Sequence, residues 1–228
     1  MSETLLVLGI DTCGPSGSVA LGRLNGVELR LLGQTELAGR SYSATLVAAV
    51  AELLSQAGVE LKKVKAIVAV NGPGSFTGVR VGLSAVKGLA EPGGIPVVAV
   101  SRLAVLANKC GCAASALDAH RGEIFLRVPG RGGEEIELLA GRIDLQLVVP
   151  PGQVAVCDES AAALLASVWP QASLLHVSAP TAADALMLAA PRILAGEFVD
   201  LALLDGHYLR RSDAEIFGEP ASAGAQRA

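Results

Sequence analysis

The sequence predicts an α/β fold in which helices and strands form layers, and it predicts that this arrangement occurs twice. Helical segments alternate with short apolar strands, which is typical of parallel strand pairing in a layered fold. An apolar strand that ends in aspartate, followed by a turn and a second strand, occurs at Asp11 and again at Asp118. The length of 228 residues is comfortable for two domains.

Three predicted strands open the chain as a meander. The apolar run 4–10 ends at Asp11, and the second strand covers 18–24. The pair Asn25-Gly26 favours a hairpin turn, and the third strand covers 27–37.

The first predicted helix covers 43–57. Ser41 or Ser43 is its N-cap, and Gly58 suits the position after its end. Apolar residues recur every three to four positions and predict one core face. The other side is smooth because it carries small residues, namely Ala44, Ala48, Ala49 and Ala51.

The remaining elements repeat this order in the second half. The first half closes with a strand at 64–70, a helix at 77–90 and a strand at 95–100. The second half contains strands at 115–118, 123–128, 135–140, 145–149, 153–157 and 173–177, and helices at 159–168 and 181–195. We divide the chain into an N-terminal lobe (1–102), a C-terminal lobe (103–217) and a disordered tail (218–228).

The composition indicates a partner surface rather than a membrane protein. Apolar residues make up 51% of the chain and charged residues 18%, and the mean hydropathy is +0.50. No uninterrupted apolar run reaches the roughly 18 residues of a membrane span. The N-terminus lacks the basic region and cleavage site of an export signal. We therefore expect a cytoplasmic protein without membrane contact, whose excess apolar area meets a partner.

The net charge and the cysteines bear on whether the protein binds nucleic acid, forms disulfides or holds a metal. The net charge is −4, and one Trp, two Tyr and four Phe are the only aromatic residues. Direct nucleic-acid binding is disfavoured because it usually needs a basic face and stacking platforms. Without a signal peptide we expect free thiols. Cys110 and Cys112 have no second Cys or His pair at zinc spacing, so we expect no metal.

The stretch 71–90, NGPGSFTGVRVGLSAVKGLA, starts like a phosphate-binding loop. It contains no G-x-x-x-x-G-K-[ST], and Thr77 stands where G-x-G-x-x-G needs its last glycine. Only the free N–H groups at the helix start favour an anion. Gly78, Gly82 and Gly88 each cost about 1 kcal/mol relative to alanine inside a helix. We interpret them, with the alanine-rich side of 43–57, as a surface for the close approach of a second molecule.

Five motifs in order resemble the bacterial TsaB (YeaZ) family over nearly the whole chain. They are VLGIDT near the start, RSYS ahead of the first helix, GPGSFTGVR at 72–80, LDAHRGEIF in mid-chain and YLRRSDAE near the end. The block GPGSFTGVR is the most specific.

This resemblance implies two related lobes of the RNase H-like, actin/Hsp70/sugar-kinase fold, each a mixed sheet flanked by helices. It also implies a non-catalytic role in making threonylcarbamoyladenosine beside the anticodon of tRNAs that read codons beginning with A. The expected partners are a TsaD-like transferase, which carries the metal and the chemistry, and a TsaE-like ATPase. The family forms homodimers when alone, and it meets tRNA only indirectly through the complex. No intrinsic cofactor is implied, with ATP or ADP as the candidate ligand at the partner interface.

The resemblance places partner binding on the helices at 43–57 and 77–90. The residues carried over to this surface are Tyr42, Thr45, Ala48, Ala49, Glu52, Phe76, Val79, Arg80, Gly82, Leu83 and Val86. A nucleotide would contact Asp11, Thr12, Gly72, Gly74 and Ser75. Two positions depart from the family, with Tyr42 where many members have His and Asn71 where Arg is frequent.

An independent enzyme is the alternative hypothesis. The chain contains neither G-x-S-x-G nor HExxH, and His120, His176 and His207 have structural explanations. An actin-fold ATPase or phosphotransferase would use acids at the tips of both first strands, which Asp11 and Asp118 supply. The loop after Asp11 lacks the usual basic residue, and aspartate is also a routine turn former. We therefore expect an accessory subunit and not an enzyme.

Overall fold

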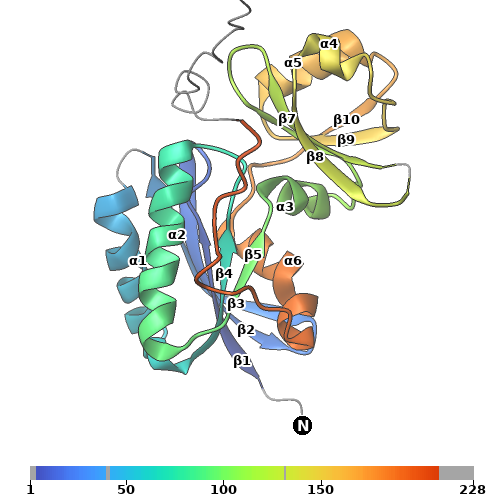
Figure 1. Cartoon of the computed structure of the whole chain (residues 1–228). Coiled ribbons are helices and arrows are strands. Elements are labelled where there is room, and N and C mark those ends of the chain that lie inside the picture. The colour runs from blue at the N-terminus through green and yellow to red at the C-terminus, as the bar shows by residue number, and fades with distance from the viewer. Residues whose placement is uncertain (1–3, 40–41, 131, 211–228) are drawn as a thin grey trace, which may run out of the picture.

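The computed structural model describes residues 4–39, 42–130 and 132–210, and it contains two five-stranded sheets (Figure 1). The first sheet contains β1 (Leu5–Asp11), β2 (Ser16–Asn25), β3 (Glu28–Ala38), β4 (Val64–Val70) and β5 (Val97–Val100). The second contains β6 (Ser115–Asp118), β7 (Ile124–Pro129), β8 (Glu135–Ala140), β9 (Gln153–Val156) and β10 (Ser173–His176). The α-helices are α1 (Tyr42–Gln56), α2 (Phe76–Ala90), α3 (Arg102–Lys109), α4 (Arg142–Leu145), α5 (Glu159–Val168) and α6 (Ala182–Ala195).

The two sheets have the same strand order. The first runs β3-β2-β1-β4-β5 and the second, read from its other edge, runs β8-β7-β6-β9-β10. In each sheet three antiparallel strands form a meander and two further strands join in parallel. This confirms the predicted α/β fold, with two actin-like lobes that each contain a mixed sheet flanked by helices.

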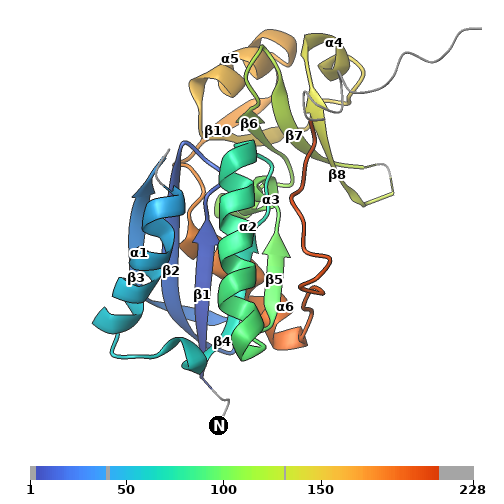
Figure 2. The ribbon, with the colours of Figure 1, turned by 60° about the vertical axis from the view of Figure 1, so that its left-hand side comes forward.

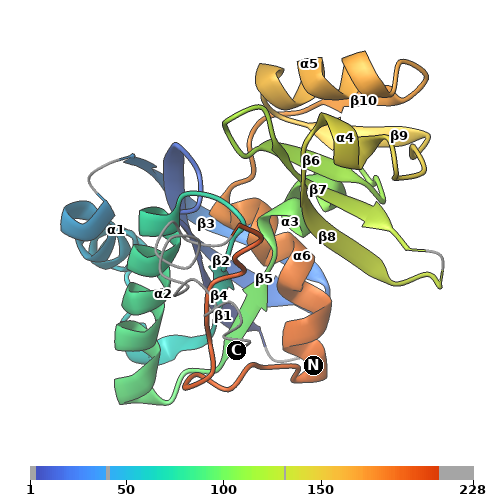
Figure 3. The ribbon, with the colours of Figure 1, turned by 45° about the horizontal axis from the view of Figure 1, so that its top comes forward.

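Helices cover both faces of the first sheet (Figures 1 and 2). Helices α1 and α2 pack against one face, and α6 packs against β1, β2 and β4 from the other. The second sheet has α3 against one side, with α4 and α5 toward the other (Figure 3). Division of the chain at residue 102 stays a proposal, and the structure adds that α6 returns to the first sheet.

Local signals explain where several helices begin and end. The Ser75 hydroxyl accepts from the Gly78 N–H at the start of α2. Thr181 and Asp184 form a reciprocal capping box at the start of α6, and Gly196 ends that helix at φ 71°. A residue with a side chain would be strained at that backbone angle, which is why glycine suits the position.

Two parts of the second half differ from the sequence prediction. The strand predicted at 145–149 is wrong, because α4 and a turn occupy this region and Leu147 and Val149 are 83% and 77% exposed. The Asp144 carboxylate accepts from the Gly141 N–H and stabilises the helical turn. Pro150 and Pro151 follow and lack the N–H that a strand ladder needs.

Helix α3 is absent from the sequence prediction, which places no element between 100 and 115. Ser101 caps it by accepting from the N–H groups of Leu103 and Ala104. Among the described residues, no helix is both long and apolar enough to cross a membrane. The tail at 218–228 lies outside the described residues, as do Arg40 and Ser41.

Candidate functional site

The loop after β1 packs directly against the glycine-rich loop that precedes α2. The Ser75 N–H donates to the Cys13 carbonyl oxygen (2.8 Å), and the Cys13 thiol donates to the Val70 carbonyl oxygen (3.2 Å). A Cβ on Gly74 would overlap the same Cys13 carbonyl. The Gly78 N–H donates to the Ser75 hydroxyl (3.2 Å). Two N–H groups that a phosphate would use at this helix start therefore have partners within the chain.

Asp11, at the tip of β1, is buried beside Arg102, an arginine that is distant from it in the sequence. The carboxylate of Asp11 is 1% exposed, and Arg102, the first residue of α3, is 5% exposed. Asp11 Oδ1 accepts from the Cys13 N–H (2.8 Å), and Oδ2 lies 3.6 Å from Arg102 Nε. The charge of Asp11 is therefore balanced within the protein, with a cation already beside it.

Gly78 and Gly82 face the interior of the protein. A Cβ on Gly78 would overlap the Thr12 carbonyl oxygen, and a Cβ on Gly82 would overlap the Thr12 hydroxyl. That hydroxyl donates to the Gly78 carbonyl oxygen (2.7 Å). A Cβ on Gly88, by contrast, meets nothing within 4 Å. The interpretation of the glycines as a surface for a second molecule is wrong for Gly78 and Gly82, because they let α2 approach the loop after β1.

The predicted partner-binding residues divide into a buried and an exposed group. Tyr42, Ala49, Val79, Gly82, Leu83 and Val86 belong to the interior of the first lobe. Thr45, Ala48, Glu52, Phe76 and Arg80 are exposed. Of the predicted nucleotide-contacting residues, Asp11, Thr12 and Gly72 are buried, Gly74 is half-buried and Ser75 is exposed.

Tyr42 shows why the buried group has structural roles. Its hydroxyl donates to the Gly14 carbonyl oxygen (2.8 Å) and so ties the start of α1 to the loop after β1. Burial, followed by the negative charge of Asp11, raises the pKa of Tyr42 to about 12. The family departure at this position therefore lies beneath the surface, with its hydroxyl protonated at neutral pH.

The outer sides of α1 and α2 form a surface that we call the α1/α2 face. Its exposed members are Ala44, Thr45, Val47, Ala48, Ala51 and Glu52 of α1 and Phe76, Arg80 and Ser84 of α2. Val47 is 57% exposed among the alanines of α1. The two helices lie side by side along one face of the first sheet in Figures 1 and 2.

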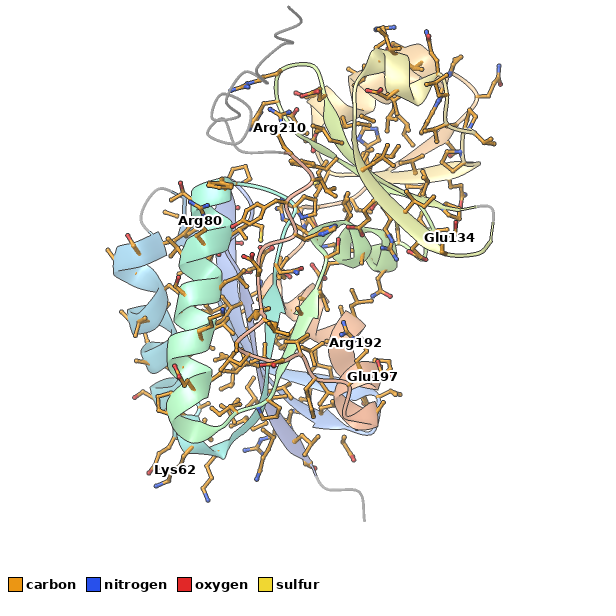
Figure 4. The ribbon with its side chains drawn as sticks, in the orientation of Figure 1. Lys62, Arg80, Glu134, Arg192, Glu197 and Arg210 are labelled. Atoms are coloured by element: carbon orange, nitrogen blue, oxygen red, sulfur yellow. The ribbon has the colours of Figure 1, made fainter. Side chains whose placement is uncertain are left out.

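An aromatic and cationic stack lies at the N-terminal end of α2, where Figure 4 labels Arg80. The guanidinium carbon of Arg80 is 3.7 Å from the centroid of the Phe76 ring. The Tyr208 ring lies 4.9 Å from Phe76 at an interplanar angle of 48°. Both rings are 37% exposed, so the stack contributes accessible aromatic area to this end of the α1/α2 face.

The segment that carries Tyr208 connects the two halves of the chain. The His207 N–H donates to the Asn71 carbonyl oxygen (2.7 Å), and His207 Nε2 lies 2.8 Å from Glu137 Oε2. Glu137 also accepts from the Ser101 hydroxyl (2.7 Å) and from Arg127 (2.7 Å). Burial alone would raise the pKa of Glu137, but the hydrogen bonds from His207, Ser101 and Arg127 outweigh it and lower that pKa.

The second predicted acid, Asp118, has a different environment from Asp11. Its side chain is 24% exposed, its Oδ1 accepts from the His120 N–H (2.8 Å), and its Oδ2 lies 2.9 Å from His120 Nδ1. His120 and Arg121 adopt positive φ angles of 62° and 59°, which are uncommon for residues with side chains. The two acids thus share a position in the duplicated fold and differ in their partners.

The cysteines have no metal partner among the described residues. No group of three or more His, Cys, Asp or Glu side chains in the described part of the chain is arranged to hold a metal ion. The sulfur atoms of Cys110 and Cys112 are 3.1 Å apart, and both thiols are free. Burial and the hydrogen bond with Cys110 raise the pKa of Cys112 to about 11.

Comparison with solved structures identifies the family. A Pseudomonas aeruginosa protein described as similar to peptidase YeaZ is 31% identical, and the match covers 92% of this chain and 100% of that one with a TM-score of 0.74. The chain belongs to the TsaB (YeaZ) family. A second structure, YeaZ from Pseudomonas aeruginosa, is 28% identical with a TM-score of 0.68.

Curated sequences agree with this assignment. The tRNA threonylcarbamoyladenosine biosynthesis proteins TsaB of Haemophilus influenzae and Escherichia coli are each 33% identical, over 129 and 125 residues. The match spans about half the length of these relatives, at 53% and 52%. Residues 34–146 also match the family model for TsaD, the tRNA N6-adenosine threonylcarbamoyltransferase.

Several residues that shape the TsaB-like site were not found from the sequence. Arg102 pairs with Asp11 and Glu137 pairs with His207, and each partner is distant in the sequence. A local sequence pattern does not indicate such pairs. Tyr208 lies in the family motif near the end, but the motif alone did not indicate that its ring stacks on Phe76.

Proposed function

We propose that this chain is a non-catalytic accessory subunit in the formation of threonylcarbamoyladenosine in tRNA, and that it binds a TsaD-like transferase. The relatives named TsaB and the match to the TsaD family model support the pathway. The α1/α2 face supports the mode of action, because it is an exposed surface on the described part of the chain.

The single observation that carries the proposal is the exposure of Val47 within a row of alanines. The side chain of Val47 is apolar and 57% exposed, so a partner that covers it would remove apolar surface from water and would be stabilised by the hydrophobic effect. The small side chains around it let another backbone or helix come close. At the end of this face, Phe76, Tyr208 and Arg80 are of the residue types enriched at the centres of interfaces.

The ion pair of Asp11 and Arg102 argues against independent chemistry. An ATPase of this fold would need the first acid to hold a magnesium ion, and a guanidinium beside that carboxylate opposes a second cation. The alternative of a self-standing ATPase or phosphotransferase is therefore disfavoured. Asp118, at the tip of β6, is only half-buried, and its carboxylate pairs with His120.

The remaining parts of the proposal concern assembly. The α1/α2 face would form a homodimer when the transferase is absent, and the same area would be covered when the transferase binds. A TsaE-like ATPase would join the pair, ATP or ADP would bind at the partner interface, and tRNA would be met only through the complex.

The test compares two exposed valines in full-length protein. Val47→Asp places a charge on the α1/α2 face, and Val149→Asp places the same charge on the second lobe, where the valine is 77% exposed. We expect Val47→Asp to weaken binding of a TsaD-like transferase at least tenfold, which corresponds to about 1.4 kcal/mol. Calorimetry measures the affinity, and a reconstituted tRNA modification assay should fall in parallel.

Val149→Asp should leave both measurements unchanged, and circular dichroism should show both variants folded. Equal affinity for Val47→Asp and the unmodified protein would refute the proposed interface. ATP turnover by the purified chain that is lost in Asp11→Ala would favour the alternative enzyme.

A further inference from the structure

A cavity lies at the end of the first sheet that is opposite to the glycine-rich loop. It has a volume of about 300 Å³ and is lined by Thr4, Leu6, Arg23, Val59, Lys63 and Lys65. Leu6 is at the start of β1, whereas Asp11 is at its other end. Lys63 closes a short 3-10 turn, Leu61–Lys63, and Lys65 lies near the start of β4. Figure 4 labels the adjacent Lys62 at this end of the molecule.

The lining contains three cations and no carboxylate. Within the described part of the chain, the side chains of Arg23, Lys63 and Lys65 form no ion pair or hydrogen bond, whereas the neighbouring Lys62 pairs with Glu60 (2.5 Å). Arg23 also lies directly opposite Arg30 in the β2–β3 pair. Like charges directly opposite each other destabilise a sheet. This accumulation on a chain of net charge −4 indicates a site for an anion.

The backbone explains how the cations reach one cavity. Leu6 pairs with Val64 and Val7 pairs with Ala66, so Lys65 is an extra residue in β4 at this point. Such an irregularity changes the direction of a strand side chain. Arg23 lies opposite Leu6 in the β1–β2 pair, and paired residues project on the same face of a sheet. Leu6, which is 8% exposed, supplies an apolar wall beside the charges.

The chemistry of the lining selects the ligand class. A guanidinium and two ammonium groups together suit a phosphate group, which carries up to two charges and several acceptor oxygens. The volume is at the lower end of the range for small-molecule sites. The lining has no aromatic ring on which a base would stack.

We propose that this cavity binds the phosphate group of a small phosphorylated molecule. The proposal does not depend on the function proposed above, because the cavity lies at the opposite end of β1 from Asp11. A phosphate of an RNA chain offers the same chemistry, and the experiment separates the two sources.

The experiment titrates full-length protein with inorganic phosphate, with AMP and with a short single-stranded RNA, and follows backbone amide resonances. We expect saturating shifts at Leu6, Lys63 and Lys65 with phosphate and AMP. The double variant Lys63→Gln/Lys65→Gln should weaken this binding at least tenfold. Lys87→Gln, which removes a cation from α2, is the matched control and should change the affinity less than twofold.

Each outcome is decisive. Binding of phosphate and AMP that the double variant weakens supports a small phosphorylated ligand. Binding of RNA alone assigns the phosphate to an RNA chain. In that case the slope of the logarithm of the binding constant against the logarithm of the salt concentration should become shallower by about 0.7 for each lysine removed. No shift at these amides with any of the three ligands, or binding that the double variant leaves unchanged, overturns the proposal.

Discussion

Replacement of Gly78 by alanine should destabilise the protein, whereas replacement of Gly88 on the same helix should stabilise it. A methyl group at Gly78 overlaps the Thr12 carbonyl oxygen, which belongs to the backbone and can move only with the whole loop. Overpacking of this kind costs about 1–3 kcal/mol. Movement of the loop also weakens the hydrogen bond from Thr12 to the Gly78 carbonyl, which is worth about 1 kcal/mol.

Because alanine favours the helix more than glycine does, the substitution by itself stabilises the protein by about 1 kcal/mol at either position. The net loss at Gly78 is therefore about 2 kcal/mol, or a melting temperature lower by roughly 4–8 °C in a chain of this size. At Gly88 no atom lies within 4 Å of the added Cβ, so the gain of about 1 kcal/mol remains.

Urea denaturation followed by far-UV circular dichroism measures both free energies of unfolding. The two variants belong to one helix and introduce the same methyl group, so differences in helix propensity largely cancel between them. A Gly78→Ala protein as stable as the parent would show that this glycine is not required by the protein's own packing. It would return Gly78 to the role of a contact for another molecule.

Three further predictions concern buried groups. Asp11→Ala and Arg102→Met should each lower the free energy of unfolding by about 3–5 kcal/mol, because each leaves a buried charge without its partner. The double variant should lose less than the sum of the two. If urea denaturation shows losses that add within about 0.5 kcal/mol, the two side chains do not interact as an ion pair. The lowered pKa of Glu137 stabilises the fold above its ordinary value of 4.5, and this contribution is lost as the pH falls through the lowered pKa. Acid denaturation of Glu137→Gln should therefore be shallower than that of the parent. Burial, and after it the negative charge of Asp11, raises the pKa of the Cys13 thiol. A thiol reagent should therefore label Cys13 only after the protein unfolds. Labelling of Cys13 in the native protein would contradict this packing.

The order of the elements was predictable because local signals fix it. Asn25-Gly26 sets the hairpin between β2 and β3, and Gly58 marks the end of α1. The run LQLVV at 145–149 has the composition of a strand, but the residues on either side of it favour a helical turn and a break. Leu145, the last residue of α4, is buried, whereas Leu147 and Val149 follow the helix and are exposed to solvent.

The placement of the partner site on α1 and α2 stays a prediction, which rests on the family motifs and on the small residues of α1. The structure changes only which of its residues are accessible. Helical periodicity indicates a face but does not say what covers it, so Gly82, Val79 and Leu83 were assigned to a partner although they pack inside. Arg102 and Asp11 come together only when α3 meets the tip of β1, and a single sequence carries no sign of that contact.

The two strand-tip acids show how a duplicated fold can divide its roles. Asp11 and Asp118 end equivalent strands in sheets of the same strand order. Of the two, Asp11 is the one that is buried next to a guanidinium group, that of Arg102. A cation bound between the lobes would need the carboxylates of both Asp11 and Asp118. The guanidinium of Arg102 beside Asp11 opposes the approach of a second cation to that carboxylate. The same ion pair joins α3 to the first sheet and so helps to hold the two lobes together. In this chain the Asp11 carboxylate forms a buried ion pair with Arg102 where α3 begins, and this pairing is consistent with the accessory role proposed above.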